Sequence, residues 1–143
     1  MDLKSLMVET RDVSVDFEAL PGFSVTLGYM SKSVNRKMAK DSTVSKMDGT
    51  GNIVSEFDAD AFGVSFCREA IKGWTGLTYG KLAQLMLINE EAIEDLDAEL
   101  PYSEDNAQLL LRESTIFDNW VSEKVGQITT FRIEKGTATV QKA

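Results

Sequence analysis

Residues 58–73, DADAFGVSFCREAIKG, mark the point where the hydrophobic spacing of the chain changes from that of a strand to that of a helix. Phe62, Phe66 and Ala70 recur every four residues, so one face of this segment is apolar at helical spacing. An aspartate precedes the run and can cap its first turn, and Gly73 can end it. The segment therefore predicts a helix that stops before a turn at Gly73.

The residues before this helix predict two antiparallel hairpins. Apolar and polar residues alternate on both sides of a Leu-Pro-Gly turn in the first hairpin, and the second surrounds Asp48-Gly49-Thr50-Gly51-Asn52. A short helix, capped by Ser31 or Ser33 and reaching about Lys40, is expected between them. The four expected strands cover residues 13–17, 23–29, 44–47 and 53–57.

Helical spacing dominates the rest of the chain. The expected helices cover residues 79–88, 104–112 and 116–128. In the last of these, one apolar stripe contains Phe117, Trp120, Val121, Val125 and Ile128. We expect Phe66, Trp120 and Val121 to share one core. The patterns together predict an α+β fold, with small N-terminal antiparallel β hairpins packed on a predominantly helical C-terminal part.

Length and composition indicate one globular domain. The chain has 143 residues, of which 43% are hydrophobic and 27% charged. We expect a single domain over residues 1–131 and a flexible tail over residues 132–143, where the apolar spacing is lost. The single cysteine excludes an internal disulfide, and no signal-like or membrane-spanning apolar run is present, so a cytoplasmic location is expected.

The charges are unevenly distributed along the chain. A net charge of -8 disfavours binding to a phosphate backbone. Acidic residues gather between Glu90 and Asp105, with no cation between Lys81 and Arg112, whereas residues 31–47 are mainly basic. These segments are either solvated faces or complementary docking surfaces for self-association or for a partner.

Most common catalytic sites are excluded by composition. The chain has no histidine, so a Ser-His-Asp triad, a Cys-His pair and a histidine metal site are impossible. No base is identifiable beside Cys67, which favours a buried, inert thiol. The loop that starts at Asp48 fails as a calcium loop, because Ile53 and Ala59 stand where glycine and glutamate are required. We therefore expect no enzyme activity, no metal and no cofactor.

Two short motifs carry a family resemblance. Gly73-Trp74-Thr75-Gly76-Leu77 forms a predicted turn, and Leu100-Pro101-Tyr102-Ser103 opens a helix in which Ser103 can cap the first amides. Together with the first hairpin and the helix at Phe117, these motifs resemble the tail assembly chaperones of long-tailed bacteriophages. The resemblance covers about Val13 to Phe131.

The resemblance implies a viral assembly factor without catalytic activity. Such a chaperone binds the tape measure protein, helps tail tube subunits polymerise around it, acts in the host cytoplasm and is absent from the mature virion. Trp74, Leu77, Phe117 and Trp120 are the candidate partner-binding residues, although core packing explains them equally well. A homo-oligomer is a further expectation. The alternative function is a structural virion protein, such as a tail tube or tail completion subunit.

Overall fold

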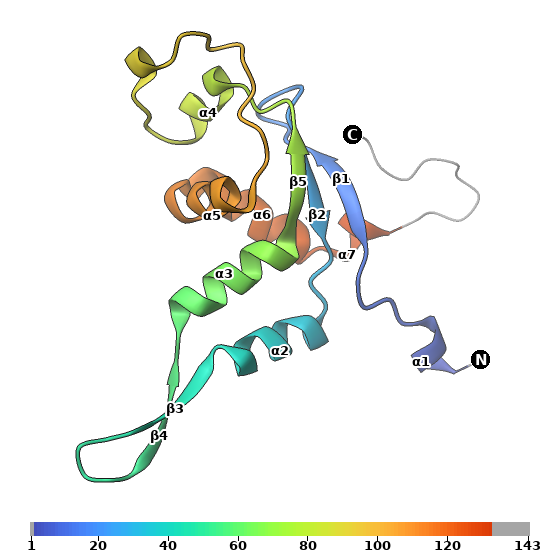
Figure 1. Cartoon of the computed structure of the whole chain (residues 1–143). Coiled ribbons are helices and arrows are strands. Elements are labelled where there is room, and N and C mark those ends of the chain that lie inside the picture. Colours follow the sequence, from blue (N-terminus) through green and yellow to red (C-terminus); the bar gives the residue numbers. More distant parts are fainter. Residues whose placement is uncertain (1, 133–143) are drawn as a thin grey trace.

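The computed structural model describes residues 2–132 (Figure 1). Its strands are β1 (Asp12–Asp16), β2 (Ser24–Gly28), β3 (Thr43–Met47), β4 (Ile53–Phe57) and β5 (Ile71–Thr75). Its helices are α1 (Leu3–Leu6), α2 (Lys32–Asp41), α3 (Ala59–Ala70), α4 (Tyr79–Leu85), the 3-10 turn η1 (Glu90–Ala92), α5 (Glu104–Glu113), α6 (Thr115–Val125) and α7 (Ile128–Phe131). The expected α+β fold class is confirmed. Apart from Arg132, the tail expected over residues 132–143 lies outside the described residues.

The centre of the fold is an antiparallel sheet of three strands in the order β1-β2-β5. β1 and β2 form the expected first hairpin, in which Val15 lies opposite Val25. β2 is the central strand, and Val25 and Leu27 are completely buried on one of its faces. The alternation of these residues with polar ones therefore marks a strand with one buried face, as predicted.

β5 differs from the sequence-based expectation. The helix was expected to reach about Lys72 and to be followed by a turn, but α3 ends at Ala70 and the chain enters β5 at Ile71. In β5, Trp74 lies opposite Val25 of β2, almost fifty positions earlier in the sequence. A buried central strand needs hydrogen-bond partners along both edges, so this long-range pairing overrides the local helical spacing.

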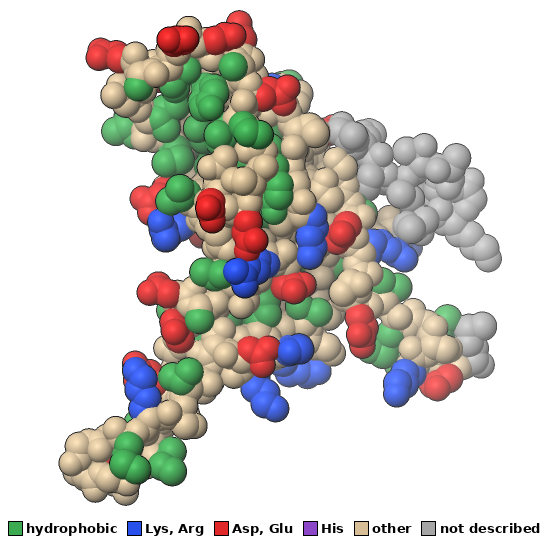
Figure 2. Space-filling model, viewed as in Figure 1, with side chains coloured by type: hydrophobic (Ala, Val, Ile, Leu, Met, Phe, Trp, Pro, Cys, Tyr) green, Lys and Arg blue, Asp and Glu red, His purple; other side chains and the backbone are tan. Residues whose placement is uncertain are grey.

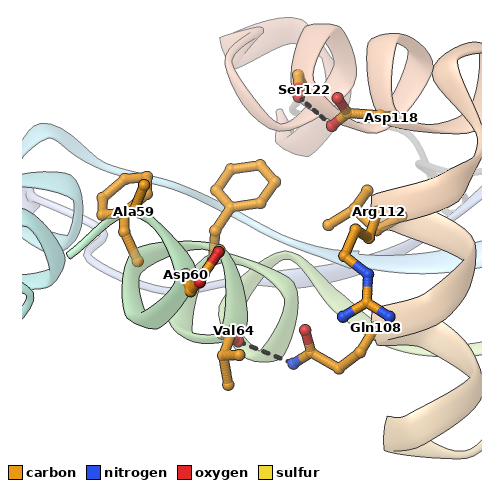
Figure 3. Close-up of a pocket in the computed structure, with 11 residues that line it drawn as sticks. Ala59, Asp60, Val64, Gln108, Arg112, Asp118 and Ser122 are labelled. Carbon is orange, nitrogen blue, oxygen red and sulfur yellow. Dashed lines mark hydrogen bonds between the residues drawn. The ribbon is translucent and has the colours of Figure 1, made fainter.

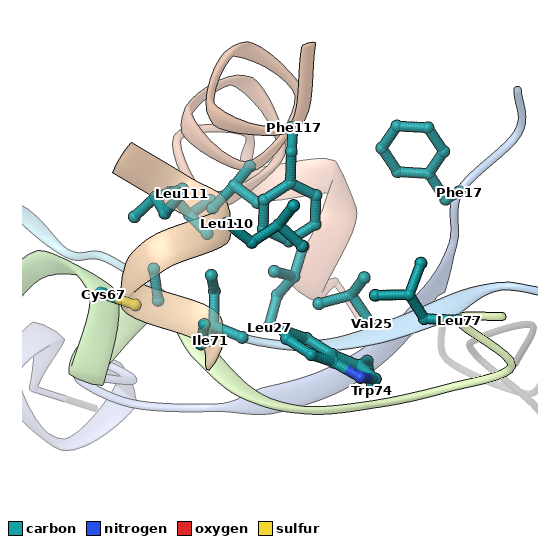
Figure 4. Packing of buried hydrophobic residues seen from close by; sticks show 14 of the residues in the cluster. Phe17, Val25, Leu27, Cys67, Ile71, Trp74, Leu77, Leu110, Leu111 and Phe117 are labelled. Atoms are coloured by element: carbon teal, nitrogen blue, oxygen red, sulfur yellow. The ribbon is translucent and has the colours of Figure 1, made fainter. Parts of the chain in front are cut away.

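The core lies between this sheet and the helices α5 and α6. Figure 4 shows Leu110 of α5 and Phe117 of α6 on the side of the sheet where Val25 and Leu27 of β2 lie, whereas Leu111 lies on the side of Cys67 of α3. Ser103 caps α5 by accepting a hydrogen bond from the amide of Asn106, and Ser114 caps α6 in the same way. The cap at Ser103 was expected from the sequence.

The last predicted helix is two shorter helices. α6 ends at Val125 and Gly126 follows as its cap, so the chain turns before α7 begins at Ile128. Ile128 is exposed and does not continue the stripe that Phe117 begins. The prediction of one helix over residues 116–128 is wrong because a glycine weakens the helix at this point.

The second expected hairpin, β3 with β4, forms but does not pack on the core. Residues 43–57, called the arm below, extend away from the body between the end of α2 and the start of α3 (Figure 1). All ten strand residues of the arm are exposed. Asp48 closes its turn by accepting hydrogen bonds from the amides of Thr50 and Asn52, as expected of a hairpin turn.

Candidate interaction surfaces

The two sequence motifs lie against each other in the structure. The indole Nε1 of Trp74 donates a hydrogen bond to the carbonyl oxygen of Leu100 at 2.9 Å. The amide of Leu100 donates to the carbonyl oxygen of Leu77 at 2.7 Å. The ring of Tyr102 meets the ring of Trp74 edge-on, with 5.2 Å between centroids. The motifs therefore form one structural unit that joins β5 to the start of α5.

Three of the four candidate partner-binding residues lie in the core. Leu77 and Phe117 have no exposed surface, and Trp74 is 8% exposed. Trp74 points inward because β5 pairs with β2. The sequence predicts a turn at this position and not a strand. For these three residues the structure agrees with the core-packing alternative, and their side chains offer almost no surface to a partner in this conformation.

Trp120 is the fourth candidate residue and is only partly buried. Its ring packs on Phe17, with 4.8 Å between ring centroids, and its Nε1 lies 3.4 Å from a carboxylate oxygen of Glu18. Lys124 forms an ion pair with the same carboxylate at 3.5 Å. Phe66 is likewise partly buried, whereas Val121 is completely buried, and all three belong to or pack against one core, as expected. Trp120 therefore forms the edge of that core.

A groove between α3, α5 and α6 was not predicted from the sequence. It has a volume of about 630 Å³. Phe62 and Phe66 of α3 and Leu111 of α5 provide apolar lining, and Gly63 leaves an open space on α3. The sequence signal for it is the four-residue spacing of the two phenylalanines, which predicts an apolar helix face.

The rim of the groove is polar (Figure 3). Gln108 of α5 donates a hydrogen bond to the carbonyl oxygen of Val64 at 3.0 Å, which bridges α5 and α3. Asp118 accepts a hydrogen bond from Ser122 at 3.3 Å. Arg112 also lines the groove. An apolar interior with a mixed charged rim suits an amphipathic protein segment better than a small polar substrate.

Acidic side chains gather at one end of the molecule, and the basic helix α2 lies toward the other, where both signs occur. Residues 86–99, called the acidic loop below, lie with α4 at the end far from α2 and the arm (Figure 1). Figure 2 shows acidic side chains at that end and basic side chains near α2. Leu87 is 98% exposed on the acidic loop. The two charged segments therefore do not neutralise each other within one chain.

The side chains considered above for catalysis or metal binding, Cys67 and Asp48, are engaged in packing and in the hydrogen bonds of a turn. Cys67 is buried, and this burial, followed by the nearby Glu104 carboxylate, raises the pKa of its thiol to about 11. Hydrogen bonds from Thr50, followed by the amide of Asn52, lower the pKa of Asp48. Within residues 2–132 no group of three or more acidic or cysteine side chains is arranged to hold a metal ion.

The described part of the chain also contains no helix long and apolar enough to cross a bilayer.

Comparisons of the sequence with family models and with curated proteins, and of the fold with solved structures, gave no match. The described residues offer four candidate interaction surfaces. They are the groove, the arm, the acidic loop and the edge of the core at Trp120.

Proposed function

We propose that this protein is a non-catalytic tail assembly chaperone of a long-tailed phage, which binds the tape measure protein and assists polymerisation of tail tube subunits. It acts in the host cytoplasm and is absent from the mature virion. The proposal rests on the sequence resemblance, and one structural observation supports it. The two motifs that carry the resemblance contact each other through Trp74 and Leu100, so they serve one structural purpose.

The exposed apolar side chains are compatible with this role. A tape measure protein presents apolar helical faces before the tube encloses it, and a chaperone must cover such faces reversibly. Leu109 of α5 and Ile116 of α6 are both exposed, and Trp120 lies partly open farther along α6. These side chains supply apolar contacts without the need to unfold the core.

Co-expression of the tagged chain with the tape measure protein and the tail tube subunit tests the proposal. We expect both the wild type and the Gly63→Ala variant to retain a tail protein in a pull-down. An unrelated acidic protein of similar size should retain neither the tape measure protein nor the tail tube subunit. Trp120→Ala reports on the edge of the core, because Trp120 is the one predicted binding residue with an accessible side chain. Failure of the folded wild type to retain any tail protein contradicts the proposal.

The alternative function is a structural virion protein, such as a tail tube or tail completion subunit. The small size, acidic charge and short strands of this chain are compatible with that class of protein. The two functions differ in where the protein is found. A virion component is present at stoichiometric amounts in purified particles, whereas a chaperone is present in the lysate and depleted from particles. Quantitative mass spectrometry of both fractions separates them.

A further inference from the structure

The turn of the arm contains the one Asp-Gly pair of the sequence, Asp48-Gly49. In such a pair the backbone nitrogen of the glycine can attack the side-chain carboxyl carbon of the aspartate, because glycine has no side chain to hinder the approach. Asp48 is exposed, and a Cβ added at Gly49 would meet nothing within 4 Å. The tip of the arm therefore presents a reactive pair of residues to water.

The folded turn holds the carboxylate of Asp48 in place. Its Oδ1 atom accepts hydrogen bonds from the amide of Thr50 at 2.8 Å, from the hydroxyl of Thr50 at 2.7 Å and from the amide of Asn52 at 2.9 Å. The amide of Asp48 donates to the carbonyl oxygen of Asn52 at 2.8 Å, which also fixes the main chain. Attack by the nitrogen of Gly49 needs a protonated carboxyl group that is free to rotate. The hydrogen bonds oppose both requirements, because they favour the charged form and restrict the rotation.

The strands that carry this turn give it little support. All ten strand residues of the arm are exposed, and a two-stranded hairpin without a covered face is at best marginally stable in water. At the root of the arm, the amide of Asp58 donates to the carbonyl oxygen of Ser42 at 2.7 Å. Elements with so few buried contacts open locally at a small cost in free energy. The turn can therefore open while the body of the protein stays folded.

We propose that Asp48 is a site of spontaneous isomerisation to isoaspartate, which the folded turn suppresses and which proceeds when the arm opens. In the open turn, the nitrogen of Gly49 forms a bond to Cγ of Asp48, and the amide proton leaves with the carboxyl hydroxyl as water. Water from the solvent then adds to the main-chain carbonyl carbon of the succinimide ring and breaks the bond from this carbon to the nitrogen of Gly49. The main chain afterwards runs through the former side chain, without a change of mass.

Isomerisation alters the arm permanently. The main chain between Asp48 and Gly49 gains a methylene group, and the free carboxylate is then attached directly to Cα. It no longer reaches the amides of Thr50 and Asn52 from its former position, so the turn that closes the strands is lost. Isoaspartate at this residue therefore records the time that the arm has spent open. This inference does not depend on whether the chain binds a tape measure protein.

Peptide mapping by electron-transfer mass spectrometry, which distinguishes isoaspartate from aspartate, tests the proposal on the full chain. Wild-type protein is incubated at one pH and temperature, both folded and unfolded in urea. We expect the folded chain to isomerise at Asp48 about threefold or more slowly, because a turn is protected in proportion to the time it is closed. Equal rates in the two states, or no isoaspartate at Asp48 in urea, overturn the proposal.

Thr50→Val is the matched change in the turn. It keeps a branched side chain but removes the hydroxyl that donates to Asp48, so the folded variant is expected to isomerise about threefold or more faster than the folded wild type. The rates of the two chains in urea should be equal. Thr129→Val, at an exposed position of α7, is the control that should leave both rates unchanged. A folded rate that Thr50→Val does not raise rejects the protective role of the turn.

Two further measurements identify the reacting bond and its consequence. Gly49→Ala should slow the reaction in both states, because the added methyl group hinders the attacking nitrogen. In wild-type protein that has isomerised, hydrogen exchange should be faster at the amides of Thr50 and Asn52, while the amides of β2 stay protected. Unchanged exchange at both turn amides would contradict the inferred loss of the turn.

Discussion

The indole Nε1 of Trp74 donates a hydrogen bond to the carbonyl oxygen of Leu100, 26 positions later in the chain. The excursion between them contains α4 and the acidic loop, and it returns to the sheet at this bond. A second bond, from the amide of Leu100 to the carbonyl oxygen of Leu77, closes the same junction. The position of α5 over the sheet therefore depends on contacts made by β5.

Replacing Trp74 with phenylalanine tests this junction. Trp74→Phe keeps an aromatic ring but leaves the carbonyl oxygen of Leu100 without its indole donor, so we expect a loss of about 1–3 kcal/mol in the free energy of unfolding. Trp120→Phe is the matched control, because the indole of Trp120 reaches only an exposed carboxylate at 3.4 Å. We expect the control to lose less than Trp74→Phe, because it leaves no buried acceptor without its donor. Urea denaturation measures both, and equal losses would show that the hydrogen bond is unimportant.

Gly76 is a second test of the same region. Its φ is +76°, and a Cβ there would lie 1.9 Å from the carbonyl oxygen of Gly22, at the turn of the first hairpin. Gly76→Ala should therefore cost about 3 kcal/mol or more, because two backbone segments must separate. Gly63→Ala is the control, and because it lies in a helix with open space it should gain about 0.5–1 kcal/mol. Thermal unfolding should move in opposite directions for the two variants.

Phe117 and Trp120 separate the interior of the core from its edge. Phe117 is completely buried, so Phe117→Ala should cost about 3–5 kcal/mol. Trp120 is only partly buried, and Trp120→Ala should cost about 1–3 kcal/mol. If Trp120→Ala leaves the urea midpoint unchanged and abolishes binding of a tail protein, then the edge of the core is a docking surface and contributes nothing to stability.

The thiol of Cys67 should be unreactive in the folded protein. Its pKa is raised to about 11 by burial, so the thiol keeps its proton at pH 8 and is not accessible. We expect an aromatic disulfide reagent to label it at pH 8 only after denaturation in urea. Fast labelling of the folded chain would show that α3 opens readily.

The same shift predicts a dependence of stability on pH. In the unfolded chain the thiol loses its proton near its ordinary pKa of 9.0, whereas in the folded chain it keeps the proton up to about 11. Rising pH between these values therefore favours the unfolded state. The stability of the wild type relative to Cys67→Ala should fall over this interval, as measured by urea denaturation at each pH. A constant difference would indicate that the thiol is not desolvated.

Local patterns in the sequence predicted most of the elements. The first hairpin, the helix capped by Ser31 and the helix capped by Ser103 lie where alternation, capping residues and turn residues indicated. These features depend on neighbours within a few positions in the sequence, so they can be recognised without knowledge of the fold. The exclusion of histidine chemistry likewise needs only the sequence.

Only the tertiary structure decided which of these elements meet. Ile71 to Thr75 became a strand because the distant β2 needed a partner on its second edge, and this pairing turned Trp74 into the core. The same spacing of Phe62 and Phe66 that predicted a buried helix face describes the lining of a groove, because α5 and α6 cover that face incompletely. Periodicity assigns a side chain to a face of its own element. Whether the face is covered depends on where the other elements of the chain lie.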